Sequence, residues 1–342
     1  MKILWTGSQG FIAGYSIDKL LEEGHQVWGV DNFWKYGKIK KSYDNHPNFH
    51  FIEMDAKNTE QLQQIMMVNS INVFVAGAAI IGGISMFHEL PYFLLRENEL
   101  ITAAAFDTCI YCKNNSNSFE KIVVISSSMV YESTTHWPSK ENDVRNIPPP
   151  LSTYGFQKLS TEYWAQGAWE QHKLNYTIIR PFNAIGIGEK RALFENDCYS
   201  GNIKLAMSHV VPDIIQKILK GQYPLRILGE GNQIRHYTYA GDLANGFYEC
   251  ITNPKSLNND FNISTSTGHT VLELANIIWH KINPNKPFAY EIDEPFIYDV
   301  QKRIPDVSKS NNILNINCNT TLDTALDEII PWIEQQVQNG GI

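Results

Sequence analysis

The first half of the chain alternates short apolar runs with longer amphipathic segments, starting at its second residue. Lys2–Thr6 is short and apolar, Phe11–Glu23 has apolar residues at helical spacing, and His25–Asp31 is again short and apolar. This alternation is typical of a parallel sheet covered by helices on both faces. It continues with strands predicted at Phe49–Met54, Val73–Ala76, Lys121–Ser126 and Tyr176–Pro181, and with helices at Thr59–Asn69, Pro91–Tyr111 and Thr153–His172.

A glycine-rich turn, Thr6 to Gly14, connects the first predicted strand to the first predicted helix. Its glycines allow a tight turn and a close approach of the backbone to a pyrophosphate, which then lies at the helix N-terminus. The spacing is Gly-x-x-Gly-x-x-Ala, and Ala13 is small enough for the helix to pack on the strand. The turn therefore predicts a dinucleotide site that includes Gly7, Gln9, Gly10, Phe11 and Ile12.

Asp31 ends the second predicted strand, 21 positions beyond Gly10. A carboxylate about 20 residues after such a turn binds the hydroxyls of the adenosine ribose. The same charge would repel a 2′-phosphate, and the turn contains no arginine to bind one, so NAD is favoured over NADP. Asp55, after the third predicted strand, is a further candidate that would face the adenine ring.

Tyr154 and Lys158 are four residues apart in a predicted helix, so they share one face of it. An ammonium group and a positive nicotinamide would both lower the pKa of the Tyr154 phenol and make it a usable base. Ser127 follows a buried strand at the sheet edge where parallel sheets bind ligands, and could hydrogen-bond the oxygen that Tyr154 deprotonates. Ser127, Tyr154 and Lys158 are the predicted catalytic residues.

The regular pattern ends near residue 183. Residues 185–209 are rich in glycine and polar residues, Val210–Lys220 resembles a helix, and Asn283–Ile304 shows little periodicity. We therefore predict a Rossmann-type, doubly wound parallel sheet in residues 1–183 and a smaller, irregular α/β substrate-binding domain in residues 184–342. The chain is expected to return to the first domain around residues 226–262.

Charge and composition exclude several classes of protein. Lys and Arg number 28 against 36 Asp and Glu, and this net charge of −8 argues against general nucleic-acid binding. The uncharged run Val73–Phe87 is interrupted by glycines and is shorter than the roughly 20 residues of a membrane-spanning helix. The 5 cysteines are scattered, which indicates a reducing compartment rather than a disulfide framework. We expect a cytoplasmic protein without a membrane segment.

In order and spacing, the glycine turn, Asp31, Ser127, Tyr154 and Lys158 resemble the extended short-chain dehydrogenase/reductases, specifically the NAD-dependent nucleotide-sugar epimerases and dehydratases. The resemblance covers about residues 1–310. It implies that the tyrosine takes a proton from a sugar hydroxyl while the ring carbon gives a hydride to NAD, and that the lysine holds the nicotinamide ribose. No metal is required. The predicted cofactor site also includes Asn32, Ala56, Ala78 and Asn98.

Three later segments extend the resemblance, at residues 180–183, 229–242 and 303–306. The resemblance implies that Asn183 and Arg235 contact the diphosphate of a nucleotide sugar, and that Arg303 and Asp306 bind phosphate and nucleoside ribose. Arginine suits such a role because its planar fork donates two hydrogen bonds to one phosphate. His236 stands where the family usually has Asp.

Ser128 and Met129, both placed in the predicted substrate site, distinguish among the reactions of the family. The resemblance implies Asp-Glu at these positions in 4,6-dehydratases, Glu at the second position in decarboxylases, and Cys there in GDP-sugar 3,5-epimerases. A thioether cannot exchange a proton, so Met129 lacks the group that these reactions use. C4 epimerisation needs only oxidation, rotation of the keto-sugar and return of the hydride. A nucleotide-sugar 4-epimerase is therefore predicted.

Residues 78–84 and 208–212 resemble the GDP-fucose synthases. His209, with Val210 beside it in the predicted substrate site, matches the catalytic histidine of those enzymes, but without their cysteine a structural role at a helix start is preferred. A GDP-sugar 3,5-epimerase, a dehydrogenase or dehydratase on the same scaffold, and a non-catalytic NAD-sensing protein stay as alternatives. The resemblance to this family also implies a homodimer, formed through Pro91–Tyr111 and Thr153–His172.

Overall fold

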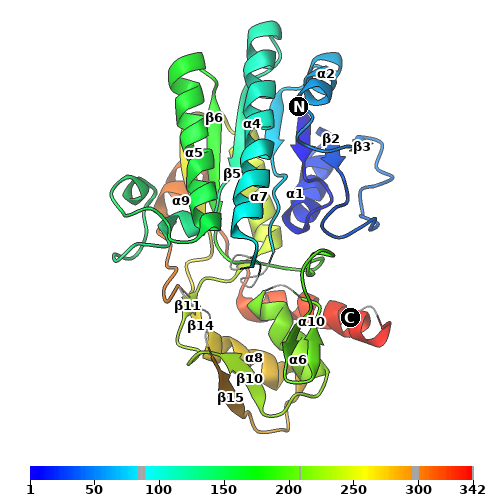
Figure 1. Cartoon of the computed structure of the whole chain (residues 1–342), viewed down its shortest axis with the longest axis vertical. Coiled ribbons are helices and arrows are strands. Elements are labelled where there is room, and N and C mark those ends of the chain that lie inside the picture. Colours follow the sequence, from blue (N-terminus) through cyan, green and yellow to red (C-terminus); the bar gives the residue numbers. More distant parts are fainter. Residues whose placement is uncertain (83–85, 87–88, 208, 295–299, 341–342) are drawn as a thin grey trace.

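The computed structural model describes residues 1–82, 86, 89–207, 209–294 and 300–340. Its larger part contains a seven-stranded parallel sheet, drawn above a smaller part in Figure 1. The strand order is β13-β6-β5-β4-β1-β2-β3, which confirms the predicted doubly wound fold because the winding reverses between β1 and β4. The strands are β1 (Lys2–Thr6), β2 (Gln26–Asp31), β3 (Phe49–Glu53), β4 (Val73–Ala76), β5 (Lys121–Ile125), β6 (Tyr176–Pro181) and β13 (Asn259–Ile263).

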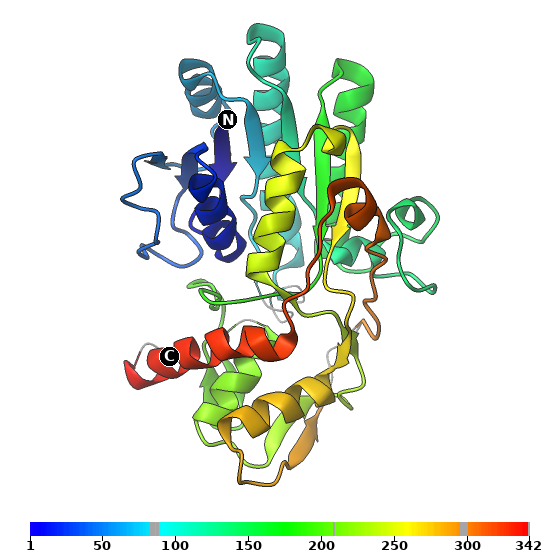
Figure 2. The same cartoon turned by 180° about the vertical axis from the view of Figure 1, so that it is seen from behind.

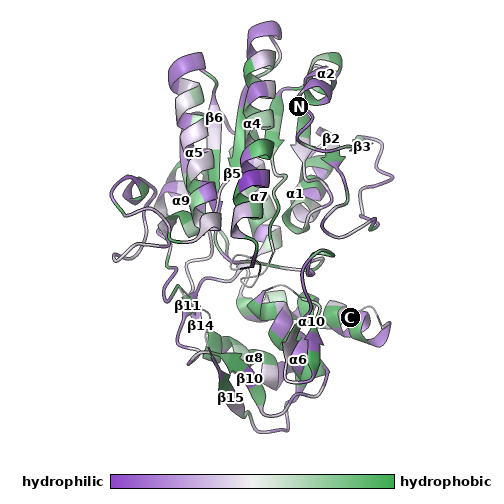
Figure 3. Cartoon of the chain, in the orientation of Figure 1, coloured by the Kyte–Doolittle hydropathy of each residue, from purple (hydrophilic) through white to green (hydrophobic). Residues whose placement is uncertain are grey.

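Helices cover both faces of the sheet because successive side chains of each strand point to opposite faces. Ile3 and Trp5 of β1 join one core and Leu4 joins the other. Figure 3 shows β5 as a hydrophobic strand among helices whose outer surfaces are more hydrophilic. The first core lies under α1 (Phe11–Glu22) and α7 (Ala240–Thr252), and the second under α2 (Thr59–Asn69), α4 (Pro91–Asn115) and α5 (Thr153–His172).

The strands and helices predicted in this half all form, with small differences at their ends. The largest difference is at α4, which continues to Asn115 instead of ending at Tyr111. Residues 112–115 contain no glycine or proline that would stop a helix, so the chain keeps its helical hydrogen bonds for one further turn. In the described ranges, no helix combines the length and the apolar character that crossing a bilayer requires.

The chain returns to the sheet through α7 and β13. Phe247 of α7 stacks on Trp5 with 6.2 Å between ring centroids, and β13 pairs in parallel with β6. The return was expected to begin near residue 226, but residues 226–228 belong to β10 (Leu225–Leu228), which pairs with β15 (Tyr290–Asp293) in the smaller part. The reason is that Leu225 and Ile227 are buried in the core of the smaller part.

The smaller part has its own apolar core, in which Trp279 and Leu326 are almost completely buried. Figure 2 shows its helices from behind, with the C-terminal helix α10 crossing below the sheet. Its helices are α6 (Val210–Leu219), α8 (Val271–Ile282) and α10 (Leu322–Gln338). The remaining elements of the chain are short. The strand pairs are β7 (Ala184–Ile185) with β12 (Thr238–Tyr239), β8 (Cys198–Ser200) with β9 (Ile203–Leu205), and β11 (Ile234–Arg235) with β14 (His269–Thr270). The short helices α9 (Ser308–Leu314), η1 (Ser128–Tyr131), η2 (Glu141–Arg145) and η3 (Pro254–Ser256) lie beside the larger part.

A buried ion pair joins the sheet to α5, the helix of the predicted catalytic tyrosine and lysine. Arg180 of β6 donates from Nε and Nη2 to the two carboxylate oxygens of Glu162, at 2.8 and 2.7 Å. Arg180 also pairs with Asp260 of β13 at 2.8 Å, and Glu162 accepts a hydrogen bond from Ser126 Oγ at 2.5 Å. These contacts hold α5 against the carboxyl ends of β5 and β6.

We predict that Glu162→Gln lowers the free energy of unfolding by about 3–5 kcal/mol, because it leaves a buried guanidinium without its bidentate partner. Urea unfolding measures the loss. The control is Asp260→Asn, which removes a carboxylate from the same arginine but leaves the bidentate pair intact. Since the Asp260 side chain is 23% exposed, we expect a smaller loss; an equal or larger one would contradict the assigned importance of Glu162.

Candidate active site

A cavity of about 950 Å³ lies at the carboxyl edge of the sheet, between the sheet and the smaller part. The ends of β1, β2, β4, β5 and β6 form one side, and residues of α6 and β10 form the other. Open parallel sheets bind ligands at this edge, where the direction of winding reverses. The volume is near the upper end of the range of about 300–1,000 Å³ that small-molecule sites occupy.

The glycine turn lines this cavity with all five of its predicted contacts: Gly7, Gln9, Gly10, Phe11 and Ile12. Gly7 has a φ of +75°, and a Cβ there would lie 2.8 Å from Ala78 Cα, so only glycine fits. Gly10 precedes α1 and has no side chain to cap it. The N–H groups of the first helical turn are therefore available to an anionic group. The turn fits a pyrophosphate.

Asp31 stands beside the turn at the end of β2. Its carboxylate accepts hydrogen bonds from Gln9 N at 3.0 Å and from Phe33 N at 2.7 Å. Burial raises the pKa of Asp31, while these bonds and the charge of Lys41 oppose the shift. Lys41 Nζ donates to Gly10 O at 3.0 Å, which places a cation beside the ribose-binding position that the sequence did not indicate.

The other predicted cofactor contacts divide into two groups. Asn32, Asp55, Ala56 and Ala78 line the cavity with Asp31. Asn98 of α4 does not: its amide accepts from Ile80 N at 2.7 Å and donates to Ile80 O at 3.0 Å. The oxygen and the nitrogen of the Asn98 amide both bind the backbone of Ile80, so Asn98 supports the cavity wall from behind.

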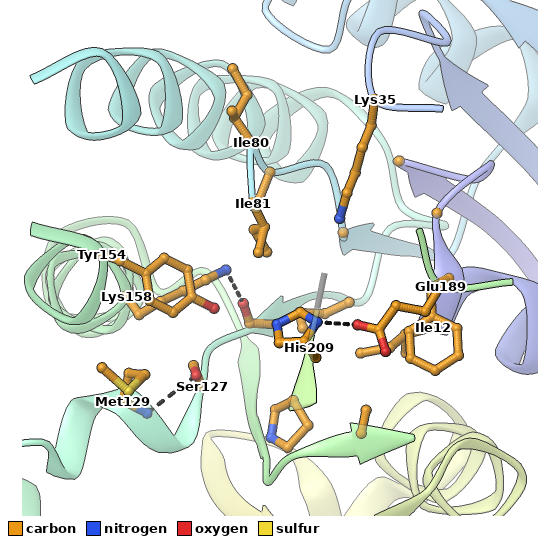
Figure 4. Close-up of a pocket in the computed structure, with 18 of the residues that line it drawn as sticks. Ile12, Lys35, Ile80, Ile81, Ser127, Met129, Tyr154, Lys158, Glu189 and His209 are labelled. Carbon is orange, nitrogen blue, oxygen red and sulfur yellow. Dashed lines mark hydrogen bonds and ion pairs between the residues drawn. The ribbon is translucent and has the colours of Figure 1, made fainter. Parts of the chain in front are cut away.

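The three predicted catalytic residues come together on one wall (Figure 4). Ser152 Oγ caps α5 by accepting from Gly155 N at 3.0 Å, which fixes the helix start one turn before Lys158. A Cβ on Gly155 would lie 2.9 Å from Met129 O, so this glycine lets the helix approach the segment that carries Ser127. The Ser127 hydroxyl is close enough to the Tyr154 phenol to influence its pKa.

The charges around Tyr154 differ from the expectation. Burial raises the pKa of Tyr154, and the nearby Ser127 hydroxyl and the charges of Arg303 and Lys35 oppose the shift. Lys158 was expected to lower this pKa, but its Nζ donates to Ile125 O at 2.9 Å and lies 6.0 Å from the centroid of the tyrosine ring. Burial lowers the pKa of Lys158 to about 8, while Glu162 raises it.

Most of the predicted substrate contacts line the same cavity: Ser128, Met129, Asn183, His209, Val210, Arg235 and Arg303. Arg303 Nη1 donates to Asn183 Oδ1 at 3.4 Å, so these two side chains are neighbours. Asp306 does not line the cavity. Its carboxylate accepts from Ser308 N at 2.8 Å at the start of α9, and this bond holds the pKa of Asp306 below its usual range.

His209 occupies the N-cap position of α6, but its side chain does not cap the helix. Its Nδ1 instead pairs with the carboxylate of Glu189, and both residues line the cavity (Figure 4). Burial lowers the pKa of His209, but the charge and the hydrogen bond of Glu189, together with the charge of Asp213, outweigh burial and raise this pKa above its ordinary value. Residues 83, 84 and 208, which belong to the segments similar to the GDP-fucose synthases, lie outside the described residues.

The sequence prediction missed several charged residues that line the cavity, among them Lys35 and Glu189. It also missed Lys41, which does not line the cavity but contacts the glycine turn through Gly10 O. Lys35 and Lys41 belong to the loop after β2, which has no regular periodicity. Glu189 follows directly after Gly186-Ile187-Gly188, and this proximity to a recognised segment is the one signal that could have indicated it. Loop residues of this kind are positioned by tertiary contacts rather than by a pattern.

Comparison with known proteins identifies the family. The model described as "NAD dependent epimerase/dehydratase family" matches residues 3–264, and the chain belongs to this family. A putative UDP-glucose 4-epimerase from Methanocaldococcus jannaschii is 28% identical over 97% of this chain and 98% of that protein. UDP-glucuronic acid decarboxylase 1 from Danio rerio is 23% identical over 99% of this chain and 74% of that protein.

Solved structures show the same fold. The UDP-glucose 4-epimerase of Thermotoga maritima, crystallised with UDP-glucose, has a TM-score of 0.81 and 26% identity, covering 98% of this chain and 100% of that one. The UDP-glucuronic acid 4-epimerase of Bacillus cereus, in complex with UDP-glucuronic acid and NAD, has a TM-score of 0.80 and 24% identity, covering 98% and 99%. The family depends on NAD, and NAD is the cofactor of this chain.

We predict that NAD binds this protein at least tenfold more tightly than NADP, because the Asp31 carboxylate repels a 2′-phosphate. Calorimetric titration of cofactor-free protein with each dinucleotide measures the ratio. Asp31→Asn, which keeps the shape and removes the charge, should reduce the ratio. Equal affinities for NAD and NADP in the unchanged protein would remove Asp31 from the ribose site and indicate that Lys41 accepts the additional phosphate.

Proposed function

We propose that this member of the NAD-dependent epimerase/dehydratase family epimerises C4 of a nucleotide-diphosphate sugar through a transient 4-keto sugar. The observation that carries the proposal is the contact between Ser127 and Tyr154 on the wall of a cavity that the glycine turn also lines. A sugar hydroxyl group placed between them could give its proton to Tyr154 while it is hydrogen-bonded to Ser127. Met129, in the same wall, offers no group that exchanges a proton.

The residues divide the work of such a reaction between them. Tyr154 takes the proton of the 4-hydroxyl group, and Ser127 hydrogen-bonds the same oxygen and fixes its position. NAD supplies a hydride acceptor when bound. Lys158 orients the nicotinamide ribose, while the charges of Arg303 and Lys35 favour the phenolate of Tyr154. The bound cofactor would return the hydride to the opposite face of C4 once the keto-sugar has rotated, and Tyr154 would then return the proton to the 4-oxygen.

The same cavity has groups suited to a nucleotide diphosphate. Arg303 and Arg235 are cationic, and Asn183 adjoins Arg303. Arginine donates paired hydrogen bonds to phosphate oxygens, so these residues are proposed to hold the diphosphate. We take UDP as the nucleotide, because the relatives from M. jannaschii, D. rerio and T. maritima are all named as UDP-sugar enzymes.

A second candidate reaction rests on His209. Its imidazole pairs with the buried Glu189 in the cavity wall, which is an arrangement that can give and take protons. Such a pair supports proton exchange at a carbon next to the 4-keto group, as in a 3,5-epimerase. The two reactions differ in whether a ring carbon exchanges hydrogen with water.

For C4 epimerisation, we predict no ring deuterium in the product formed in deuterated water, because the same hydride leaves and returns. The enzyme is given a panel of UDP-, GDP-, CDP- and dTDP-sugars, and the products are analysed by mass spectrometry. NADH should not accumulate. Deuterium at C3 or C5 would contradict the proposal and make His209 the acid/base, while steady accumulation of NADH would indicate a net dehydrogenase.

The control for this experiment is Tyr154→Phe, which removes only the phenolic oxygen. The turnover of whichever sugar reacts should fall by about 100-fold or more, since a general base contributes a factor of this size. Binding of UDP, measured by calorimetry, should stay unchanged because the arginines are intact. Unchanged turnover in Tyr154→Phe would refute its assignment as the base.

We also propose a homodimer, formed by α4 and α5. These helices lie side by side in Figure 1, and Trp164 Nε1 donates to Glu99 Oε2 between them at 3.0 Å. Isolated apolar side chains on a surface need no explanation, but a group of them marks an interaction site. The exposed group on the two helices is Tyr92, Leu100, Tyr111, Phe156, Tyr163 and Trp164.

We predict that sedimentation equilibrium gives twice the chain mass of 39.0 kDa for the unchanged protein. Tyr163→Glu should reduce it to a monomer, because Tyr163 is 62% exposed on α5 and a charge there would be buried in the dimer. Tyr199→Glu is the matched control, since Tyr199 is 58% exposed on β8. A monomeric unchanged protein, or equal masses for the two variants, would contradict this interface.

A further inference from the structure

Lys35 extends from the loop after β2 into the cavity, on the side opposite Tyr154 and Lys158 (Figure 4). Lysine side chains normally carry their charge out to water. This one is turned inward because its loop is anchored to the segment that contains Leu193 and Phe194. Leu193 N donates to Lys35 O at 2.9 Å, and the neighbouring Trp34 stacks on Phe194 with 3.6 Å between ring centroids.

The charge of Lys35 has no ion-pair partner among the carboxylates of the described residues. The two carboxylates whose charges reach it are engaged elsewhere, since Glu189 pairs with His209 and Glu195 pairs with Arg191 at 2.9 Å. Its Nζ lies over the ring of Tyr36 instead, 4.8 Å from the centroid. A desolvated cation in this position favours the binding of an anion.

The surroundings of Lys35 favour its charged form. Burial lowers the pKa of Lys35, but the Tyr36 phenol and the charges of Glu189 and Glu195 outweigh burial and raise it above its ordinary value. Lys41, the other lysine near the glycine turn, differs from Lys35 both in the partner of its Nζ and in the direction of its pKa shift. Its Nζ is already bound to Gly10 O, and burial lowers its pKa to about 8.

We propose that Lys35 binds the pyrophosphate of NAD from the side opposite the glycine turn. The turn supplies N–H groups and a helix N-terminus but no cationic side chain. A pyrophosphate brings two negative charges, so a cation facing it stabilises the complex. Lys35 is only four residues beyond Asp31, and Figure 4 shows it on the same side of the cavity as Ile12 of the glycine turn.

The anionic groups of a nucleotide sugar are the other source of negative charge. They lie closer to cations of their own, because Arg235 and Arg303 line the part of the cavity that adjoins Asn183. The loop of Lys35 follows a strand of the dinucleotide-binding sheet, whereas both arginines belong to segments after residue 230. The dinucleotide is therefore the favoured ligand of Lys35.

The test is calorimetric titration of cofactor-free protein with ADP-ribose and with adenosine, which contains no phosphate. Lys35→Met keeps the length of the side chain and removes its charge. We expect it to weaken ADP-ribose binding about tenfold or more, as for a lost hydrogen bond to a charged group, and to leave adenosine binding unchanged. Lys35→Arg should restore most of the affinity for ADP-ribose.

Lys38→Met is the matched control, because Lys38 is on the same loop but its side chain is 71% exposed and pairs with Glu53 at the surface. It should bind both ligands as the unchanged protein does. Affinity for ADP-ribose should also fall with added salt more steeply in the unchanged protein than in Lys35→Met. If Lys35→Met does not fold, Lys35→Gln serves for the same comparison.

Three results would overturn the proposal. The first is equal ADP-ribose binding by the Lys35→Met and Lys38→Met proteins. The second is an equal loss for adenosine and ADP-ribose, which would assign the effect to the loop rather than to the charge. The third is weaker binding of UDP with ADP-ribose unaffected, which would assign Lys35 to the substrate. None of these measurements depends on which sugar the enzyme converts.

Discussion

The parallel pairing of β1 with β2 on one side and β4 on the other determines where every part of the site can lie. In a parallel sheet all strands end at the same edge, so residues that follow different strands become neighbours. Gly7 follows β1, Asp31 ends β2, Ala78 follows β4 and Ser127 follows β5. These residues are spread over 121 positions of the chain, and the sheet brings them to one cavity. The contact of Gly7 with Ala78 shows how closely the segments after β1 and β4 meet, since no side chain fits between them.

The catalytic wall depends on a second constraint, the attachment of α5 to the sheet. Arg180 holds Glu162 from β6, and Ser126 donates to the same carboxylate from the end of β5. Since Lys158 is one helical turn before Glu162, this anchor also fixes the distance from the lysine to the sheet edge. The buried charges thus position α5 more sharply than apolar packing, which is not directional.

The doubly wound sheet could be predicted from the sequence because fully buried parallel strands are short, continuous apolar runs. The residues of the turn and of the Tyr154 helix could be predicted because their chemistry depends on local spacing. Local spacing did not predict that the side chains of Asn98 and Asp306 lie outside the cavity lining. Each has a polar side chain near a recognised segment, but its hydrogen bonds go to the backbone of residues 80 and 308. The position of Lys35 depends on a contact with residue 193, and no local pattern contains that information.

The cavity places two groups that handle protons on different walls, and this separation limits the chemistry that can follow oxidation. Tyr154 stands with Ser127 at the sheet edge, while His209 stands with Glu189 at the start of α6, in the smaller part. A sugar held with its C4 hydroxyl against Tyr154 turns different ring carbons toward His209 according to how its diphosphate is held. Under the proposed function, the arginines that hold the diphosphate therefore influence the reaction as well as the affinity. A 4-epimerase requires the keto-sugar to rotate in the cavity, and Met129 favours this motion because a flexible apolar side chain forms no hydrogen bond that would hold one orientation.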